Sequence, residues 1–444
     1  MKKSLVSVLS VLTFAAMITA CSSKQNDWIN PVSNQSENDR IEIEFWHSMG
    51  SSNGELLQKL TDEFNQSQDE IYVKAIHQGS YADANTKFMA ALSAGDAPVV
   101  AQMEIGNIGI FAEADQLVDL KVYAEDETFE RNDFIWGLLD ASFYEGELIA
   151  LPHSRSLPVM YYNKDWFQFN GLNSEMPPRN WSELKRAAKT LTKNDVYGYS
   201  CPLDPWYFNA LMMCAGGSIY NDTISSIGFC DEAGTAPLYL WKELIEDGIM
   251  YVPSGQDYNS SEACRNLFAE GTAAIIMQSS AQLKGLEQTC DFEVGVAPIP
   301  IRSVRVYPAG GSNLVMFQGH SEEKQKAGWE FIKFMTSTEC SVTWANGTGY
   351  LPVRQSCMES DTYKEMLEED ENLQIIIDNV NYCSVIPFFS EYDETMEIIS
   401  DEIQECILKD KYTPEDTVKK LLCVWKNYFL FTAHATKYEY NTQT

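Results

Sequence analysis

Carboxylates, hydroxyls and thiols are abundant in this chain, but none of them has the spacing of a known catalytic motif. The sequence contains no P-loop and no H-E-x-x-H pair. Residues 310–314, Gly-Gly-Ser-Asn-Leu, approach the nucleophile elbow G-x-S-x-G but end in leucine. With 64 acidic residues, a pair of glycosidase carboxylates remains an alternative, although most such carboxylates form solvated surface. We therefore predict no catalytic residue, with a secreted carbohydrate-active enzyme as the alternative.

Metal and thiol chemistry are not indicated either. The five histidines are scattered, no C-x-x-C pair occurs, and we expect no metal and no cofactor. Beyond Cys21, the sequence holds Cys201, Cys214, Cys230, Cys264, Cys290, Cys340, Cys357, Cys383, Cys406 and Cys423. An even number in an exported protein is compatible with disulfides, but a chain of this length needs no such links. The pairing stays open.

The amino terminus has the layout of an export signal. Lys2 and Lys3 precede an apolar run over residues 5–20, and Ile-Thr-Ala leads into Cys21. This ending resembles a lipobox, so we expect cleavage after residue 20 and acylation of Cys21. The alternative is an ordinary cleaved signal with a chance cysteine. The prediction places the protein on the cell membrane, facing the periplasm or the exterior, with lipid as its only membrane contact.

Charge and length narrow the remaining possibilities. The net charge of −32 argues against nucleic acid as a partner. No second apolar stretch is long enough to span a bilayer. A chain of 444 residues is too long for a single core and suits two domains.

The pattern of elements begins after a polar tether over residues 21–39. Ile41, Ile43 and Phe45 alternate with glutamates, which predicts a strand. A helix around residues 57–64, a strand around 71–75, a helix around 88–92 and a strand over 97–103 follow. This strand–helix alternation predicts a parallel, doubly wound α/β sheet.

A second set of elements starts near residue 150. Residues 159–162 form a short buried strand, and Asn180 begins a helix whose apolar stripe includes Leu184 and Leu191. Helices are also expected after Ser321 and over residues 413–431. We expect residues 40–150 with 308–357 to form an N-terminal lobe, and residues 151–307 with 358–444 a C-terminal lobe. Ligands of open α/β sheets bind where the strands end, so the site should lie between these lobes.

Several segments spread over the chain carry a family resemblance. They are residues 43–49 (Ile-Glu-Phe-Trp-His-Ser-Met), 79–81 (Gly-Ser-Tyr), 157–165 (Leu-Pro-Val-Met-Tyr-Tyr-Asn-Lys-Asp), 310–311 (Gly-Gly) and 347–352 (Gly-Thr-Gly-Tyr-Leu-Pro). Together they resemble family 1 extracellular solute-binding proteins of ABC importers, above all the glycerol-3-phosphate- and sugar-binding members. The resemblance implies a class II periplasmic-binding-protein fold, with two lobes, helices on both faces of each sheet and a hinge.

The same resemblance implies a ligand site. The positions that match the family's contacts are Tyr81, Glu104, Ser156, Ser279, Gly311 and Tyr350. Their chemistry suits a sugar or a polyol: a carboxylate accepts hydrogen bonds from hydroxyls, and tyrosine rings cover C–H faces. Trp206 is a further stacking candidate, with core packing as the alternative.

One departure concerns the ligand's charge. The family places a phosphate-binding arginine in a C-terminal helix after a Pro-Phe pair, but here Pro387-Phe388 leads into a helix without arginine, and Glu397 falls near that place. Arg155 and Arg302 are the candidates that could compensate. The resemblance thus implies a monomeric receptor that captures a sugar, a glycerol-3-phosphate-like polyol or a glycerophosphodiester. It would deliver that solute to an ABC permease driven by a cytoplasmic ATPase. A surface adhesin is the third alternative.

Overall fold

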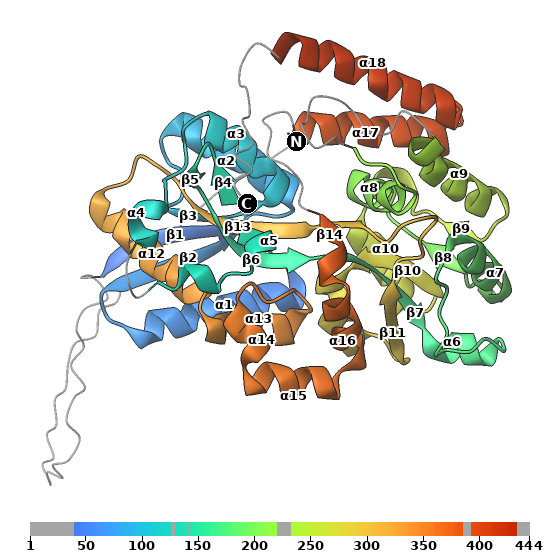
Figure 1. Cartoon of the computed structure of the whole chain (residues 1–444), viewed down its shortest axis with the longest axis horizontal. Coiled ribbons are helices and arrows are strands. Elements are labelled where there is room, and N and C mark those ends of the chain that lie inside the picture. The colour runs from blue at the N-terminus through green and yellow to red at the C-terminus, as the bar shows by residue number, and fades with distance from the viewer. Residues whose placement is uncertain (1–39, 126–128, 140–141, 220–231, 385–391, 433–444) are drawn as a thin grey trace, which may run out of the picture. The chain divides into compact units, whose positions relative to one another are not determined.

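The computed structural model describes residues 40–125, 129–139, 142–219, 232–384 and 392–432 (Figure 1). Arg40–Thr444 forms one unit, separate from Met1–Asp39. The predicted signal peptide, the tether and Cys21 therefore lie outside the described residues, as do Cys230 and the Pro387-Phe388 pair.

The first of two five-stranded sheets has the order β2-β1-β3-β13-β6. Its strands are β1 (Ile41–His47), β2 (Ile71–His77), β3 (Val100–Glu104), β13 (Gly310–Met316) and β6 (Leu151–Ser156). The predicted strands at 41 and 71 are confirmed, and the third begins at Val100. β1 pairs in parallel with β2 and β3, whereas β13 runs antiparallel to β3 and β6. The sheet is therefore mixed, because β13 returns from a distant part of the chain to a place between β3 and β6.

Helices cover both faces of this sheet. α1 (Ser51–Ser67) and α12 (Glu322–Met335) share one apolar cluster with the inward side chains of β1, including Phe45. α2 (Tyr81–Ala94) and α3 (Ile108–Glu113) belong to a second cluster around Phe88 and Phe111. Two separate cores follow from the alternation of side chains along each strand.

The second sheet has the order β11-β7-β10-β8-β9. Its strands are β7 (Pro158–Asn163), β10 (Ile275–Ser279), β11 (Val294–Pro298), β8 (Tyr199–Ser200) and β9 (Met250–Tyr251). Every residue of β7 is buried, which explains the unbroken apolar run in the sequence. The helices between these strands are α6 (Lys164–Phe169), α7 (Trp181–Leu191), α8 (Pro205–Cys214), α9 (Glu232–Glu246), α10 (Ser261–Ala269) and α11 (Leu283–Thr289).

Eight further helices, single 3-10 turns and two small ladders complete the described fold. The remaining helices are α4 (Lys121–Ala124), α5 (Trp136–Leu139), α13 (Thr338–Thr348), α14 (Gln355–Glu359), α15 (Asp361–Glu369), α16 (Glu371–Asp378), α17 (Tyr392–Ile407) and α18 (Pro414–Thr432). The single 3-10 turns are η1 (Ile105–Asn107), η2 (Arg131–Asp133), η4 (Gly255–Asp257), η5 (Ser280–Gln282) and η6 (Val380–Tyr382). Two small ladders pair β4 (Phe143–Tyr144) with β5 (Glu147–Leu148), and β12 (Tyr307–Pro308) with β14 (Cys383–Ser384).

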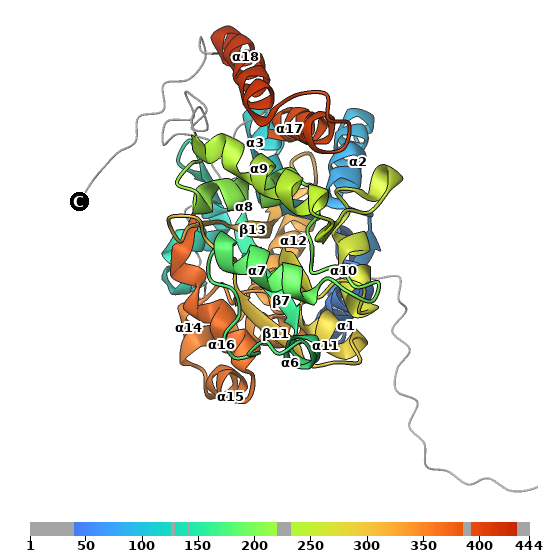
Figure 2. The same cartoon turned by 90° about the vertical axis from the view of Figure 1, so that its right-hand side faces the viewer.

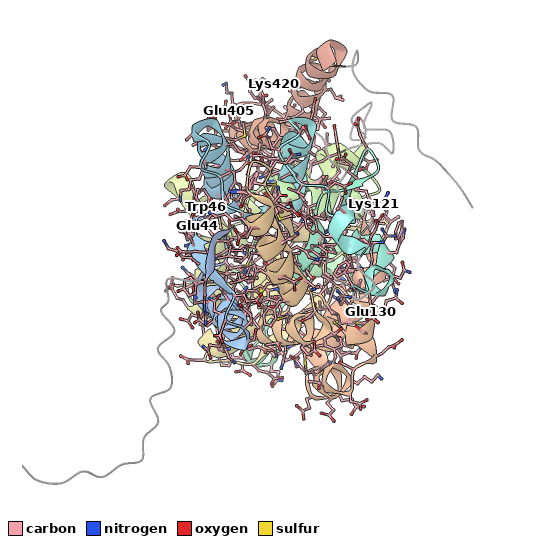
Figure 3. All side chains as sticks on the ribbon, turned by 90° about the vertical axis from the view of Figure 1, so that its left-hand side faces the viewer. Glu44, Trp46, Lys121, Glu130, Glu405 and Lys420 are labelled. Carbon is pink, nitrogen blue, oxygen red and sulfur yellow. The ribbon has the colours of Figure 1, made fainter. Side chains whose placement is uncertain are left out.

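The last two helices lie side by side along one edge (Figures 1 and 2). Lys420 of α18 forms an ion pair with Glu402 of α17, and the neighbouring Glu405 binds Lys409 and Lys411 (Figure 3). Within the described ranges, every helix is too short or too polar to cross a lipid bilayer.

The chain passes from the first sheet to the second at Leu157. β6 and β7 follow one another with only this residue between them. The Leu157 N–H donates to Ser280 Oγ (3.3 Å), and the Ser280 N–H donates to the Leu157 carbonyl (2.8 Å). The two sheets define the two lobes of the α/β fold. Which whole segments belong to each lobe stays a prediction. β6 (Leu151–Ser156), which lies in the range expected for the C-terminal lobe, pairs within the first sheet.

The nine described cysteines are free thiols. Most are buried, and Cys201, Cys264 and Cys406 belong to the large apolar cluster around the second sheet. Buried thiols of this kind behave as small apolar side chains. Packing in the core thus accounts for the buried cysteines, and none of the nine described thiols is part of a disulfide.

Candidate functional site

A cavity of about 260 Å³ lies between the ends of the two sheets. Its lining combines hydroxyls, carboxylates and aromatic rings from both lobes: Tyr81, Glu104, Ile105, Gly106, Ser156, Asp204, Trp206, Tyr207, Ser261, Ser279, Gln282, Ala309, Gly310, Gly311, Tyr350 and Tyr392. All the ligand contacts expected from the sequence, from Tyr81 to Tyr350, are in this set. The volume is close to the lower end for pockets that enclose small molecules.

Strand ends bring these residues together. Glu104 ends β3, Ser156 ends β6 and Ser279 ends β10. β13 runs the opposite way, so its first residues reach the same edge: Gly310 is paired with Ser156. The cavity therefore occupies the place where open α/β sheets bind ligands, beyond the carboxyl ends of the strands.

Gly311 is required by the backbone itself. Its φ is +103°, and a Cβ atom there would lie 1.8 Å from the Ser154 carbonyl oxygen. No L-residue with a side chain fits such a position. Gly310 matters differently, because a Cβ there would lie 2.7 Å from the Trp206 ring. Both glycines let the chain pass close to its neighbours and leave room for the indole at the cavity wall.

Two tyrosines enter the cavity from the first lobe. Tyr81 is the first residue of α2, which Ser80 and Asp83 start with a reciprocal capping box. Tyr350 follows α13, and its ring stacks on Trp344 with centroids 5.6 Å apart. Burial is the main cause that raises the pKa of Tyr81, followed by the neighbouring Tyr350. Both phenols are therefore neutral donors and acceptors at physiological pH.

Two carboxylates face the same cavity. Burial, then Asp393 and Asp204, raise the pKa of Glu104 from 4.5 to about 8. Burial also raises the pKa of Asp204 to about 6, against hydrogen bonds from the backbone N–H groups of Trp206 and Tyr207. Among the described residues, neither carboxylate forms an ion pair with a basic side chain. The cavity thus brings two acidic groups together with no basic side chain among its described lining residues.

Sequence reasoning missed Asp204, Tyr207 and Tyr392, and left Trp206 open. For Asp204 and Tyr207 the sequence did carry a signal. Asp204 is the N-cap of α8, and Pro205 follows it at the first helical position. That start turns Asp204, Trp206 and Tyr207 toward the cavity. Tyr392 begins α17, and only the tertiary contact of its ring with Gly106 brings it to the site.

The residues considered for phosphate binding do not line the cavity. The Arg155 side chain is buried, and its Nη2 donates to the Leu138 carbonyl (3.1 Å). Arg302 forms an ion pair with Glu232 at the surface. Glu397 is exposed on α17, one turn after Asp393, whose pKa it helps to raise. In the described part of the chain, no lysine, arginine or histidine is among the lining residues.

A family model for bacterial extracellular solute-binding proteins matches residues 59–371. This match covers most of the chain. The protein belongs to the bacterial extracellular solute-binding proteins. The two-lobed α/β fold agrees with that of the structural neighbours, and the expected family resemblance is confirmed.

Individual relatives agree with this assignment. The sn-glycerol-3-phosphate-binding periplasmic protein UgpB of Rhizobium meliloti is 27% identical over 339 residues, which is 72% of this chain and 76% of that protein. UgpB from Mycobacterium tuberculosis, solved with glycerophosphocholine, superposes with a TM-score of 0.79 at 23% identity, covering 89% of this chain and 99% of that one. The GacH receptor of Streptomyces glaucescens, solved unliganded and with acarbose, gives 0.79 at 22% identity, covering 88% and 99%. The Rhizobium relative is named as a binding protein, and the Streptomyces protein is described as a receptor.

The raised pKa of Glu104 makes stability depend on pH. Between pH 4.5 and about 8 the folded state keeps a proton that the unfolded state loses, so the free energy of unfolding falls as pH rises through this window. Glu104→Gln cannot ionise. We expect its free energy of unfolding to exceed the parent's by about 1–3 kcal/mol at pH 8 and to match it near pH 5. Urea unfolding of parent and variant at pH 5 and pH 8 measures this difference. The same difference in free energy of unfolding at both pH values would contradict a raised pKa of Glu104.

Proposed function

We propose that the protein is the solute receptor of an ABC-type importer and that it captures a small, hydroxyl-rich solute without a phosphate group. The observation that carries this proposal is the cavity lining, which joins two carboxylates and several aromatic rings but no basic side chain among the described residues. Carboxylates accept hydrogen bonds from hydroxyls, and rings cover the C–H faces of a sugar. The contacts we assign to the solute are Tyr81, Glu104, Ser156, Ser279, Gly311 and Tyr350.

The proposed solute differs from the one for which the Rhizobium relative is named. A phosphate needs charge-assisted donors, ideally the fork of an arginine. Here the nearest buried guanidinium, that of Arg155, is bonded to a main-chain carbonyl instead. A phosphate in the cavity would face Asp204 and no basic side chain among the described lining residues, and like charges at close range are unfavourable. The sugar-binding members of the family are therefore the better guide to the ligand.

Matched pairs of solutes test this ligand class. We expect unphosphorylated sugars to bind at least about tenfold more tightly than their phosphates, or about 1.4 kcal/mol in free energy. The measurement is titration calorimetry on the chain from residue 22 onward, with glucose against glucose 6-phosphate and glycerol against sn-glycerol 3-phosphate. Chromatography of the same mixtures should show no product, which separates a receptor from a glycosidase. Tight binding of sn-glycerol 3-phosphate would defeat the proposal.

Closure of the lobes on the solute depends on a close contact across the cavity. Tyr392 of α17 lies against Gly106 of η1, where a Cβ atom would be 2.2 Å from the ring. Beside it, the Asn85 amide of α2 donates to the Asp393 carboxylate. The second-lobe helix α17 thus meets the first lobe at a place where the lack of a side chain on Gly106 leaves space for the Tyr392 ring. Hinge closure around a ligand is the usual motion of such receptors.

Gly106→Ala should therefore hold the lobes apart. Overpacking of a well-filled contact costs about 1–3 kcal/mol, so we expect solute affinity to fall by roughly ten- to a hundredfold with an unchanged circular dichroism spectrum. Small-angle scattering should show less compaction on adding solute. Gly285→Ala is the control, because its Cβ would meet only Ser52 Oγ at 3.6 Å. Equal affinity of Gly106→Ala and Gly285→Ala would remove this contact from the closure mechanism.

A lipid on Cys21 would hold the receptor beside its permease. Acylation at the end of the apolar run follows from the lipobox resemblance, and more than one chain is needed for stable anchoring. The closed receptor would then dock on permease subunits powered by a cytoplasmic ATPase.

Cys21→Ser tests the anchor. The variant should leave the membrane fraction or accumulate as an unprocessed precursor, because the thioether link to lipid cannot form. Fractionation with labelled palmitate measures both outcomes. A variant that takes up label and sediments with membranes like its parent would show that the anchor lies elsewhere.

A further inference from the structure

The charge on the cavity walls is one-sided. Glu104 and Asp204 line the cavity itself, and Asp393 stands close enough to Glu104 to raise its pKa. Glu397 acts on Asp393 in the same sense. These acids come from β3, the start of α8 and α17, which belong to both lobes. Folding therefore brings two acidic groups into the lining of one small cavity and places two more, Asp393 and Glu397, outside it on α17.

No described basic group offsets this charge from within the cavity. Arg155 lies behind Tyr81, and its guanidinium bonds to the Leu138 carbonyl rather than to a carboxylate. Asp204 accepts backbone N–H groups at the start of α8, whereas no described residue donates a hydrogen bond to the Glu104 carboxylate. An enclosed carboxylate without a counter-charge is costly and stays protonated unless a cation reaches it.

Aromatic rings surround the same space. Tyr81, Tyr350, Trp206 and Tyr207 line it together with Tyr392, and they come from four separate places in the chain. Trp206 and Tyr207 meet edge to face with centroids 4.9 Å apart. Trp206 Nε1 is buried without a hydrogen-bond partner among the described residues. The negative faces of such rings attract a cation, and more strongly when water is excluded.

We propose that the solute carries a positively charged nitrogen on a hydroxyl-bearing frame, and that this nitrogen sits between Glu104 and Asp204 among the aromatic rings. This inference rests on the proposed receptor function and adds the sign of the ligand's charge to it. Hydroxyls alone would engage the acids as acceptors but would leave their charges facing each other. A protonated or quaternary nitrogen opposes both carboxylates at once and meets the rings.

Calorimetry with charge-matched pairs tests the inference. The first arm compares glucosamine with glucose and N-acetylglucosamine, and the second compares choline with its neutral isostere 3,3-dimethylbutan-1-ol. At about pH 6.5 the sugar amine is protonated. We expect the cationic member of at least one pair to bind ten- to a hundredfold more tightly, and the arm that responds distinguishes an ammonium sugar from a quaternary ammonium. Binding of the cation should release a proton from Glu104, seen as a heat that varies with the buffer's ionisation enthalpy.

Variants connect that preference to the carboxylates. Asp204→Asn keeps the helix cap, because asparagine caps as well as aspartate, and Glu104→Gln keeps the side-chain shape. Each should reduce the preference for the cation about tenfold, and Glu104→Gln should also abolish the proton release. Glu394→Gln, an exposed neighbour of Asp393 on α17, is the control and should keep the parent's preference.

The outcomes separate this inference from the receptor proposal. If neutral members bind as well as the cations or better, the solute is uncharged and the inference fails while the receptor stands. If phosphorylated sugars bind more tightly than both, the proposed ligand class fails as well. If no member of either pair binds, the proposal that the solute carries a positively charged nitrogen is also wrong. An equal loss of affinity for neutral and cationic members in Asp204→Asn would assign that residue to structure rather than to charge.

Discussion

The passage of the chain through Leu157 is the constraint on which the site depends. One extended run serves as β6 in the first sheet and β7 in the second, and the Leu157 N–H and carbonyl are both held by Ser280. Nearby, the Leu351 N–H donates to the Arg155 carbonyl (2.7 Å). Because both sheets share this run, their strand ends must meet beside it. Residues as distant in sequence as Glu104, Ser279 and Tyr350 become neighbours for this reason.

The same geometry explains why the acids have shifted pKa values. A cavity between two packed sheets excludes most water, and burial is the first cause of the raised pKa of both Glu104 and Asp204. A core optimised for stability would replace such groups by apolar ones. Their presence lowers the stability of the protein and leaves groups that a ligand can satisfy. Sites of this kind are where function departs from the best packing.

Much of the fold was predictable because its information is local. Neighbouring residues alone indicate several elements. These are the alternating strands β1 and β2, the helix starts at Asn180 and Ser321, and the buried strand β7. The mixed sheet was not predictable, because β13 inserts from some two hundred residues beyond β3. Two-residue strands such as β8 and β9 are too short for any periodic signal. Three of the expected contact residues, Glu104, Ser156 and Ser279, converged because they end strands. Tyr392 needed a tertiary contact with Gly106 that no local pattern encodes.

A family assignment indicates the fold that surrounds the site, but a few side chains decide which charge the ligand can carry. Arg155 shows this well: it sits one residue before Ser156, yet its guanidinium is directed to the Leu138 carbonyl, away from the cavity lining. Sequence position alone suggested a phosphate partner, and the bonding of the side chain argues against it. The cavity lining instead contains Glu104 from one lobe and Asp204 from the other. If the lobes close on the solute as proposed, a ligand of opposite charge would lower the free energy of the closed state more than a neutral one. In this proposal, the charge of the solute and the motion of the lobes are linked through the same pair of carboxylates.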